Sequence, residues 1–245
     1  MNSQSKKVNI ILLAAGVEQS KQKDGYPLCL SEVNSVPLIQ KIINQTNQIT
    51  GNRLIVNFRE AEANKYHLDN IVRLLNSDSK VVKIPFDTQG ASCTALLSIG
   101  DIDSDDNLLI INGNEYIDID FSKIINGFIK DKLDGGVVVF KSIHPRYSFV
   151  KLNEMGLVIE ASEKNPISNI ATTGFYWFSK GKDFVSAAKS CIKKDARVNG
   201  KFYICPTYNE MILNNKKIGV HEIDEKLYHP IKSEHQLENF QNLKN

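Results

Sequence analysis

The feature of this sequence that most restricts its fold is a set of short, almost wholly apolar runs separated by amphipathic segments. Residues 8–13 (VNIILL) and 107–112 (NLLIIN) are the clearest of these runs. Continuous apolar runs of this length are typical of strands buried on both faces, as in parallel sheets covered by helices. Small or polar residues follow, at 14–16 and at 112–115. Such sheets bind ligands outside the carboxyl ends of their strands, so these two segments are the first candidates for a site.

Strand and helix patterns alternate along the first half of the chain. We expect strands at 8–13, 53–58, 80–84, 107–112 and 135–141, and helices at 37–48, 61–75, 90–99 and 121–131. The second half predicts a hairpin of 148–153 with 157–162, a strand at 171–178, helices at 182–194 and 208–214, and a strand at 219–222. A polar tail at 236–245 follows, either irregular or with one helical turn. This order predicts one three-layer α/β/α domain over residues 1–245, with a mostly parallel Rossmann-like sheet and right-handed crossovers.

Composition narrows the function classes. Hydrophobic residues make up 42% of the 245 residues and charged residues 24%, which is typical of a globular chain. The net charge of +2 comes from 30 basic and 28 acidic residues, so no basic surface for nucleic acid is expected. The apolar runs are too short to span a membrane. The four cysteines lack the spacing of a zinc site, which favours free thiols in a reducing, cytoplasmic setting.

Several segments together resemble one family. The stretches are LLAAG at 12–16, GYPLCLSEVNSVPLIQKII at 25–43, TQGASCTALLSIGDIDSDDNLLIINGNEYIDID at 88–120, HPRYSFVKL at 144–152, EKNPISNIATTGFYWF at 163–178 and NGKFYICPTYNEMI at 199–212. In this order they resemble the sugar-phosphate nucleotidyltransferases of bacterial capsule and lipopolysaccharide gene sets. The resemblance implies the nucleotide-diphospho-sugar transferase fold. It also implies a reaction that joins a nucleoside triphosphate to a sugar 1-phosphate and releases pyrophosphate, with Mg²⁺ as the cofactor.

The resemblance also implies which residues bind each ligand. On the nucleotide side it points to the loop after the first strand and to a backbone contact with the base. On the sugar-phosphate side it points to the EK pair and to a glycine in the aromatic strand. The metal position is Asn114. The expected binding residues are Ala14, Ala15, Gly16 and Gly90 for the nucleotide, and Glu163, Lys164 and Gly174 for the sugar phosphate.

Several charged positions of the family pattern hold other residues. The second loop glycine is Glu18 and the loop arginine is Ser20. The lysine of the PKPL motif is Leu28, which can neither donate a hydrogen bond nor carry charge, and the metal aspartate is Asn114. Contacts of this kind stabilise a transition state by roughly 2.7–4 kcal/mol each, so losing several would nearly abolish the reaction.

Two lysines flank the altered loop. Lys21 and Lys23 are candidate catalytic residues that would replace the missing cations, and the alternative is that both are solvated loop lysines. Arg146, followed by Tyr147, predicts either an anion-binding side chain or a surface turn.

Three functional hypotheses remain open at this point. The first is an active nucleotidyltransferase of surface-polysaccharide synthesis. The second is a catalytically inactive domain that binds a nucleotide sugar or sugar phosphate, or that serves an active enzyme as its partner. The third is a metal-dependent glycosyltransferase that uses Asp118 and Asp120, for which a solvated strand edge or helix entry is the alternative. The partners expected are nucleotide and sugar-phosphate small molecules, without nucleic acid or a membrane span, and the choice between a homo-oligomer and an enzyme partner stays open.

Overall fold

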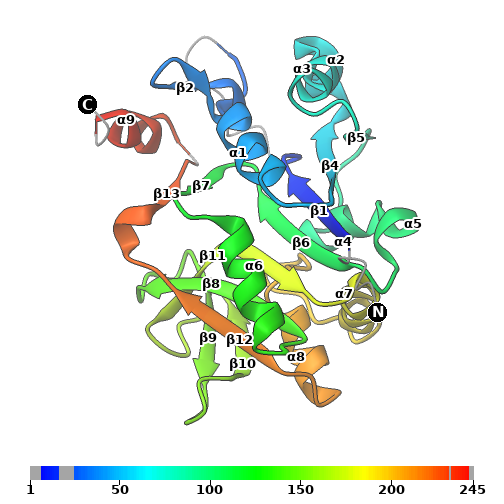
Figure 1. Ribbon diagram of the computed structural model, residues 1–245, viewed down its shortest axis with the longest axis vertical. Coiled ribbons are helices and arrows are strands. Elements are labelled where there is room, and N and C mark those ends of the chain that lie inside the picture. Colours follow the sequence, from blue (N-terminus) through cyan, green and yellow to red (C-terminus); the bar gives the residue numbers. More distant parts are fainter. Residues whose placement is uncertain (1–6, 17–24, 232, 243–245) are drawn as a thin grey trace.

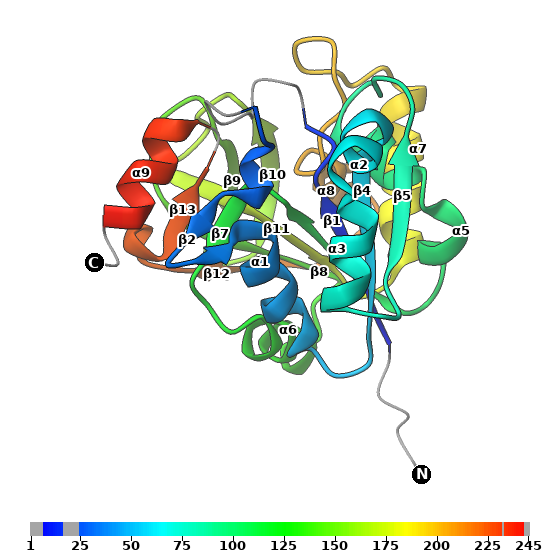
Figure 2. The same cartoon turned by 90° about the horizontal axis from the view of Figure 1, so that it is seen from above.

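A central sheet with helices on both faces forms the body of the molecule (Figures 1 and 2). The computed structural model describes residues 7–16, 25–231 and 233–242. The sheet has nine strands: β1 (Val8–Leu13), β4 (Asn52–Arg59), β5 (Lys80–Ile84), β6 (Asn107–Asn112), β8 (Gly135–Lys141), β9 (Ser148–Leu152), β10 (Val158–Glu163), β11 (Ile170–Phe178) and β12 (Ile218–Glu222).

The sheet is mostly parallel, with one strand of opposite direction near its middle. Strands β5, β4, β1 and β6 lie side by side in this order, and all of their pairings are parallel. Strand β11 then pairs antiparallel with β6 on one edge and with β8 on the other, and β12 continues parallel to β8. The hairpin of β9 and β10 joins the first half of β11. The prediction of a three-layer α/β/α fold with a mostly parallel sheet is therefore confirmed.

Two layers of helices cover the sheet. One hydrophobic cluster includes residues of α1, α2, α3, α6 and α9, and a second cluster on the other face includes residues of α4, α5, α7 and α8. The bounds of these helices are α1 (Leu38–Asn47), α2 (Glu60–Tyr66), α3 (Leu68–Leu75), α4 (Ala91–Leu96), α5 (Ile99–Ile102), α6 (Phe121–Lys130), α7 (Gly181–Lys193), α8 (Thr207–Leu213) and α9 (Glu234–Asn242).

The apolar run at the start of the chain shows why this architecture forms. In β1, Ile10 and Leu12 belong to the first cluster and Ile11 belongs to the second. Because successive side chains of a strand point to opposite faces, a strand covered on both faces needs apolar residues at every position. All three side chains are fully buried.

Three sequence predictions need correction. The helix expected at 61–75 is two helices, because His67 takes a left-handed backbone conformation (φ 54°) and ends α2. The helix expected at 90–99 is likewise divided into α4 and α5. Instead of at most one helical turn in the polar tail, the chain forms the helix α9, which begins before the predicted tail and buries Leu237 and Phe240. Two apolar side chains are too few to reveal an amphipathic pattern in nine residues of sequence.

Short pieces that the sequence pattern missed close the carboxyl edge of the sheet. β2 (Glu32–Val33) pairs with β3 (Val36–Pro37), next to the 3₁₀ turn η1 (Leu28–Leu30). β7 (Glu115–Ile117) pairs antiparallel with β13 (Tyr228–Pro230), which follows a second 3₁₀ turn, η2 (Glu225–Leu227). The second pair brings the C-terminal segment next to the residues that follow β6, and α9 packs on it in Figure 2.

Two further properties of the described chain concern membranes and thiols. A helix with the length and apolar character needed to cross a bilayer is not found in the part of the chain that the structure describes. All four cysteines are free thiols, with Cys191 and Cys205 buried and Cys29 and Cys93 half-buried.

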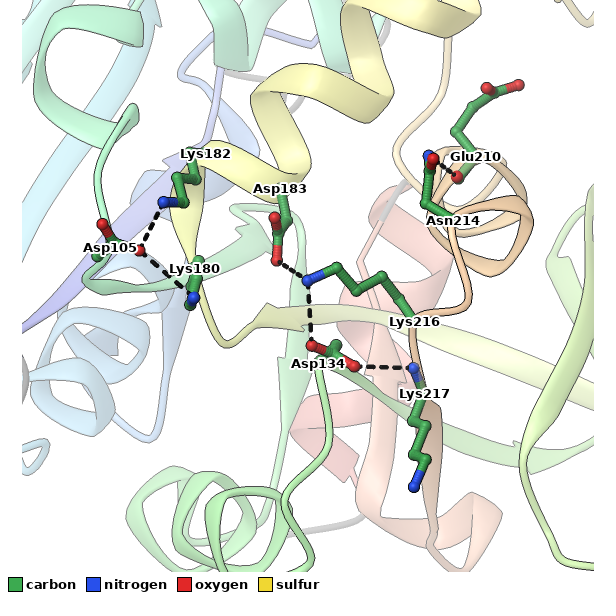
Figure 3. A network of polar contacts seen from close by, with 9 residues as sticks. All are labelled: Asp105, Asp134, Lys180, Lys182, Asp183, Glu210, Asn214, Lys216 and Lys217. Carbon is green, nitrogen blue, oxygen red and sulfur yellow. Dashed lines mark hydrogen bonds and ion pairs between the residues drawn. The ribbon is translucent and has the colours of Figure 1, made fainter.

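A network of charges fastens the opposite, amino edge of the sheet (Figure 3). Lys216, just before β12, lies between Asp134, which precedes β8, and Asp183 in the first turn of α7. Its Nζ is 3.3 Å from Asp134 Oδ1 and 3.2 Å from Asp183 Oδ2. The backbone N–H of Lys217 donates to the other oxygen of Asp134 at 3.0 Å. Since the Asp134 and Asp183 carboxylates both face the ammonium group of Lys216, this lysine holds together two carboxylates that would otherwise repel each other. Nearby, Lys180 and Lys182 both pair with the Asp105 carboxylate.

Replacing this shared cation tests the role of the network. We expect Lys216→Met to lower the free energy of unfolding by about 1–2 kcal/mol, because it leaves two half-buried carboxylates without their common partner. Urea unfolding followed by circular dichroism measures this. Lys189→Met, at an exposed position of α7, is the control and should change stability by less than about 0.5 kcal/mol. Equal midpoints for the two variants would contradict the assignment.

Candidate functional site

A cavity of about 510 Å³ lies at the carboxyl ends of β1 and β6. Segments from both halves of the chain line it, including the ends of β1, β6 and β10 and the middle of β11. The described residues that the resemblance assigns to the nucleotide, the sugar phosphate or the metal are all among the lining residues: Ala14, Ala15, Gly16, Gly90, Asn114, Glu163, Lys164 and Gly174. The fold thus gathers them around one space, while the binding role of each stays a prediction.

The other sequence candidates fall elsewhere. Lys21 and Lys23 lie outside the described residues, as do Glu18 and Ser20. Asp118 and Asp120 do not line the cavity. Instead, the Asp120 carboxylate accepts a hydrogen bond from the Lys123 N–H at 3.1 Å and caps helix α6. The expectation of a helix entry accounts for Asp120, and the geometry offers no support for a glycosyltransferase metal site there.

The wall where the sequence predicts the nucleotide, called the nucleotide-side wall below, includes the loop after β1, which is held against the two neighbouring strands. The Ala14 N–H donates to the Asn57 carbonyl at 3.0 Å, and the Gly113 N–H donates to the Leu13 carbonyl at 2.8 Å. A Cβ on Gly113 would lie 2.9 Å from the Ala14 Cβ. Only glycine permits this close approach, so the loops after β1 and β6 form one continuous surface.

Arg59, at the end of β4, is a lining residue that the sequence reading missed. Its Nε donates to the Gly16 carbonyl at 3.0 Å, and its terminal nitrogen lies 2.6 Å from Asp87. The guanidinium therefore joins the loop after β1 to the segment before α4. It places a cation on the nucleotide side, where the expected PKPL lysine is absent. The position just past a strand end was the sequence signal that could have identified it.

The Gly90 turn forms the next part of this wall. Gly90 has φ 121°, and a Cβ there would lie 2.3 Å from the Phe202 carbonyl oxygen. Thr88 and Thr94 share a 2.6 Å hydrogen bond across the turn, and the hydroxyl that accepts in this bond can donate its own proton to the Gly90 carbonyl. Phe86 lines the cavity with a largely exposed ring. The turn is rigid and presents backbone atoms and one aromatic side chain.

The wall where the sequence predicts the sugar phosphate, called the acceptor side below, contains a buried carboxylate and several hydroxyl groups. Ser148 donates a short hydrogen bond to Glu163. Tyr176 shares a 2.9 Å hydrogen bond with Thr172 and reaches Ser148 at 3.5 Å. Burial raises the pKa of Tyr176 well above its usual range, and the charge of Glu163 contributes to the rise. The phenol therefore stays protonated and can act only as a neutral hydrogen-bonding group.

Three exposed cationic side chains line the cavity on this side. Arg146, Lys164 and Lys201 line the cavity and are exposed. The Arg146 guanidinium lies 4.7 Å from the centre of the Tyr147 ring and donates to its hydroxyl. Of the two interpretations of Arg146, the geometry favours an arginine that faces the cavity. With Arg59, four cations line the cavity and suit an anionic ligand, and four carboxylates, those of Glu62, Asp87, Glu115 and Glu163, line it as well.

Glu115 supplies the second buried carboxylate, and the sequence analysis included it in the candidate segment 112–115 without giving it a role. Its Oε2 accepts a hydrogen bond from Asn112 Nδ2 at 3.0 Å. A Cβ on Gly174 would lie 2.0 Å from the same oxygen. Burial, followed by the charge of Glu115, raises the pKa of Tyr228 well above its usual range. Glu115 is thus fixed among β6, β11 and β13. Its position one residue after the expected metal position was the available signal.

The donor set near Asn114 does not fit a Mg²⁺ ion held by protein side chains. Mg²⁺ prefers carboxylate oxygens in octahedral geometry, and Asn114 offers an uncharged amide. Glu115 already bonds Asn112, and the residue that pairs with Glu115 on β13 is Pro230. Within the described ranges, no three Asp, Glu, His or Cys side chains gather in a way that could hold a metal. Leu28, at the family's lysine position, is 1% exposed and belongs to the core.

A mostly parallel α/β sheet with a cavity at the carboxyl ends of its strands is the arrangement in which open α/β proteins bind their ligands. The family model for nucleotidyl transferases matches residues 23–216. This is well over half of the chain, which therefore belongs to the nucleotidyl transferase family.

Relatives and solved structures agree with this membership. The bifunctional protein GlmU of Methanococcus aeolicus is 24% identical over 172 residues, which cover 69% of this chain and 39% of that protein. The chain thus spans well under half the length of this curated relative. The nucleoside-diphosphate-sugar pyrophosphorylase from Vibrio cholerae RC9 has a TM-score of 0.77 at 20% identity, with 96% and 99% of the two chains covered. The inositol-1-phosphate CTP transferase from T. maritima has a TM-score of 0.72 at 15% identity, with 97% and 96% covered. These structures share the fold.

A pair of glycines tests how tightly the cavity floor is packed. Gly174 (φ 77°) and Gly156 (φ 75°) have nearly the same positive φ, but of the two only Gly174 lacks room for a Cβ. We expect Gly156→Ala to cost about 1–2 kcal/mol of stability through left-handed backbone strain alone. Gly174→Ala should cost about 1–3 kcal/mol more, because the methyl group meets Glu115. Denaturant unfolding of both variants measures the difference, and equal losses would show that Glu115 moves aside freely.

Proposed function

We propose that this protein is a sugar-phosphate nucleotidyltransferase that joins a nucleoside triphosphate to a sugar 1-phosphate in the cavity. The observation that carries the proposal is that one cavity is lined both by the loop residues 14–16 with Gly90 and by Glu163, Lys164 and Gly174. The first set would receive the nucleotide and the second set the acceptor. The family membership supports the reaction class.

In the proposed reaction these residues mainly position the two substrates. A phosphate oxygen of the acceptor forms a bond to the α-phosphorus of the nucleotide, and the bond to pyrophosphate breaks in line with it. Lys164, Lys201 and Arg146 would hold the acceptor phosphate. Glu163 would accept hydrogen bonds from acceptor hydroxyl groups, since its carboxylate lies in the wall and is oriented by Ser148. Arg59 would offer its remaining donors to the nucleotide phosphates.

Two observations favour a second candidate, a nucleotide-sugar or sugar-phosphate binding protein without catalysis. Leu28, which occupies the family's lysine position, is packed against the core and brings no charge to the cavity. Asn114 and its neighbours do not form a metal site in the described chain. Binding needs only the walls, whereas transfer also needs charge neutralisation at the departing pyrophosphate.

Finer aspects of the function rest on the sequence resemblance. We propose that Mg²⁺ enters, where it is needed, as the counter-ion of the nucleotide phosphates and not as a resident ion of the protein. We further propose a place for the product in bacterial capsule or lipopolysaccharide synthesis. Lys21 and Lys23 stay candidates for the missing cations. The choice between a homo-oligomer and a partner enzyme also stays open.

A substrate panel tests the proposal. CTP, UTP, dTTP, GTP and ATP are each combined with glucose 1-phosphate, N-acetylglucosamine 1-phosphate, mannose 1-phosphate and inositol 1-phosphate in the presence of Mg²⁺. Pyrophosphate release and thermal stabilisation are recorded for every pair. We expect one pair to release pyrophosphate. We also expect Lys164→Met to weaken binding of that acceptor roughly ten- to hundredfold, since a charge-assisted hydrogen bond contributes about 1.5–3 kcal/mol.

The control for this variant is Lys141→Met, which removes an ion pair with Glu222 away from the cavity. It should leave acceptor binding unchanged. Stabilisation without pyrophosphate release would favour the binding protein. Neither release nor stabilisation by any pair would reject both candidates.

The metal position offers a gain-of-function prediction. Asn114→Asp adds the charge that a hard cation prefers at the cavity wall. We expect nucleotide binding in this variant to become roughly tenfold stronger when Mg²⁺ replaces EDTA, and binding to the unaltered protein to respond less. Calorimetric titration with CTP in both buffers checks this.

Asp118→Asn is the matched control because it changes one carboxylate outside the cavity, and it should bind like the unaltered protein. A strong Mg²⁺ response lost in Asp118→Asn would instead support the glycosyltransferase hypothesis.

A further inference from the structure

We propose that Tyr203 is a positioning residue: it holds Lys164 toward the acceptor phosphate, and it is itself held by Ser92 of the nucleotide-side turn. Nucleotide binding and acceptor binding would then be coupled through Ser92, Tyr203 and Lys164. The inference rests on the proposed function, because it assigns a role within the same cavity.

The first link joins Lys164 to Tyr203. Lys164 Nζ donates to the Tyr203 hydroxyl at 3.0 Å and lies 5.1 Å from the centre of the same ring. Both residues line the cavity. A tyrosine orients the ammonium group without neutralising it, unlike a carboxylate partner, so the charge stays available to a phosphate. Holding the long side chain in place also lowers the conformational entropy lost when the acceptor binds.

The backbone of Lys164 is fixed as well. Lys164 follows the end of β10 in a left-handed conformation (φ 56°), and its N–H donates to the Tyr147 carbonyl at 2.9 Å. Such a conformation is costly for a lysine and persists only where the surroundings impose it. With the main chain held at one end and Nζ at the other, the direction of the side chain is determined by its two tyrosine neighbours.

The second link joins Tyr203 to the Gly90 turn. Ser92 is fully buried. Its hydroxyl donates to the Tyr203 carbonyl at 2.7 Å, and its N–H donates to the Phe202 carbonyl at 3.1 Å. In return, the Phe202 N–H donates to the Gln89 carbonyl at 2.8 Å. Three hydrogen bonds therefore tie residues 202–203 to residues 89–92, and Gly90 lets the two backbones approach closely.

These two links join the two sides of the cavity through one short segment. A nucleotide seated on the Gly90 turn would restrain Ser92 and, through it, Tyr203 and Lys164. By reciprocity, an acceptor phosphate that restrains Lys164 would favour nucleotide binding by the same factor. Coupling through a contiguous set of hydrogen bonds is a physical expectation that binding measurements can test directly.

The experiment is a crossed titration with the nucleotide and phosphate ester that stabilise the full chain most in the panel above. Affinity for the ester is measured by calorimetry with and without saturating nucleotide. We expect Tyr203→Phe, which keeps the ring but removes the hydroxyl, to weaken ester binding about fivefold and to change nucleotide binding alone by less than about twofold. Ser92→Ala should reduce the enhancement of ester binding by nucleotide about fivefold.

Combining variants separates positioning from a loss of folded structure. In a Lys164→Met background, Tyr203→Phe should have no further effect on ester binding, because the group that it positions is gone. Two controls match the chemistry outside the cavity. Tyr116→Phe removes a hydroxyl of β7 that donates to Asp118, and Ser168→Ala removes a hydroxyl that donates to the Val150 carbonyl. Neither should alter ester binding or its coupling to nucleotide.

The outcomes separate the two proposals. If no pair in the panel binds the unaltered protein, the proposed function fails. If a pair binds and Tyr203→Phe and Ser92→Ala behave as the controls do, the proposed function stands and the positioning role is rejected. Equal weakening by Tyr203→Phe in the presence and absence of Lys164 would also reject it.

Discussion

The insertion of antiparallel β11 between β6 and β8 is the constraint on which the site depends. The second half of β11 pairs with β6, and its first half adjoins the hairpin of β9 and β10. The nucleotide-side loops and the acceptor-side pair Glu163 and Lys164 are therefore neighbours across a single strand. The register along β8 shifts between Thr172 and Tyr176, and within this bulge Gly174 turns its Cα toward Glu115. Without this irregularity the buried carboxylate would have no room.

Charge is distributed unevenly around the cavity. Three exposed cations stand on the acceptor side, whereas Arg59 on the nucleotide side is already engaged with Gly16 and Asp87. The PKPL position shows the physical reason for part of this difference. Leu28, the first residue of η1, packs against the core and also lines the cavity, so it presents apolar surface where the family pattern has a charged lysine. The acceptor half is thus better equipped for phosphate than the half that would hold a triphosphate.

The strongest periodic elements were predictable from the sequence. The continuous apolar runs predicted strands β1 and β6, since a strand needs apolar residues at every position only when both of its faces are buried. Elements of two or three residues, such as β2, β3, β7 and β13, contain too few positions for a pattern. Helix α9 was missed because it buries only Leu237 and Phe240, whose contacts with the rest of the chain are tertiary. His67 ended a continuous helical pattern through its backbone conformation, which its residue type only weakly favours.

The sequence by itself determined the layered α/β architecture, the family and the residues that line the cavity from segments 14–16 and 163–164. These follow from local patterns, and the matching of short motifs needs no distances. Only the tertiary structure decided that Arg59 joins two loops and that Glu115 is fixed against Gly174. It also decided that Ser92 contacts Tyr203, 111 positions further along the sequence. Such contacts depend on strand order and register, because residues far apart in the chain become neighbours only after the sheet has formed.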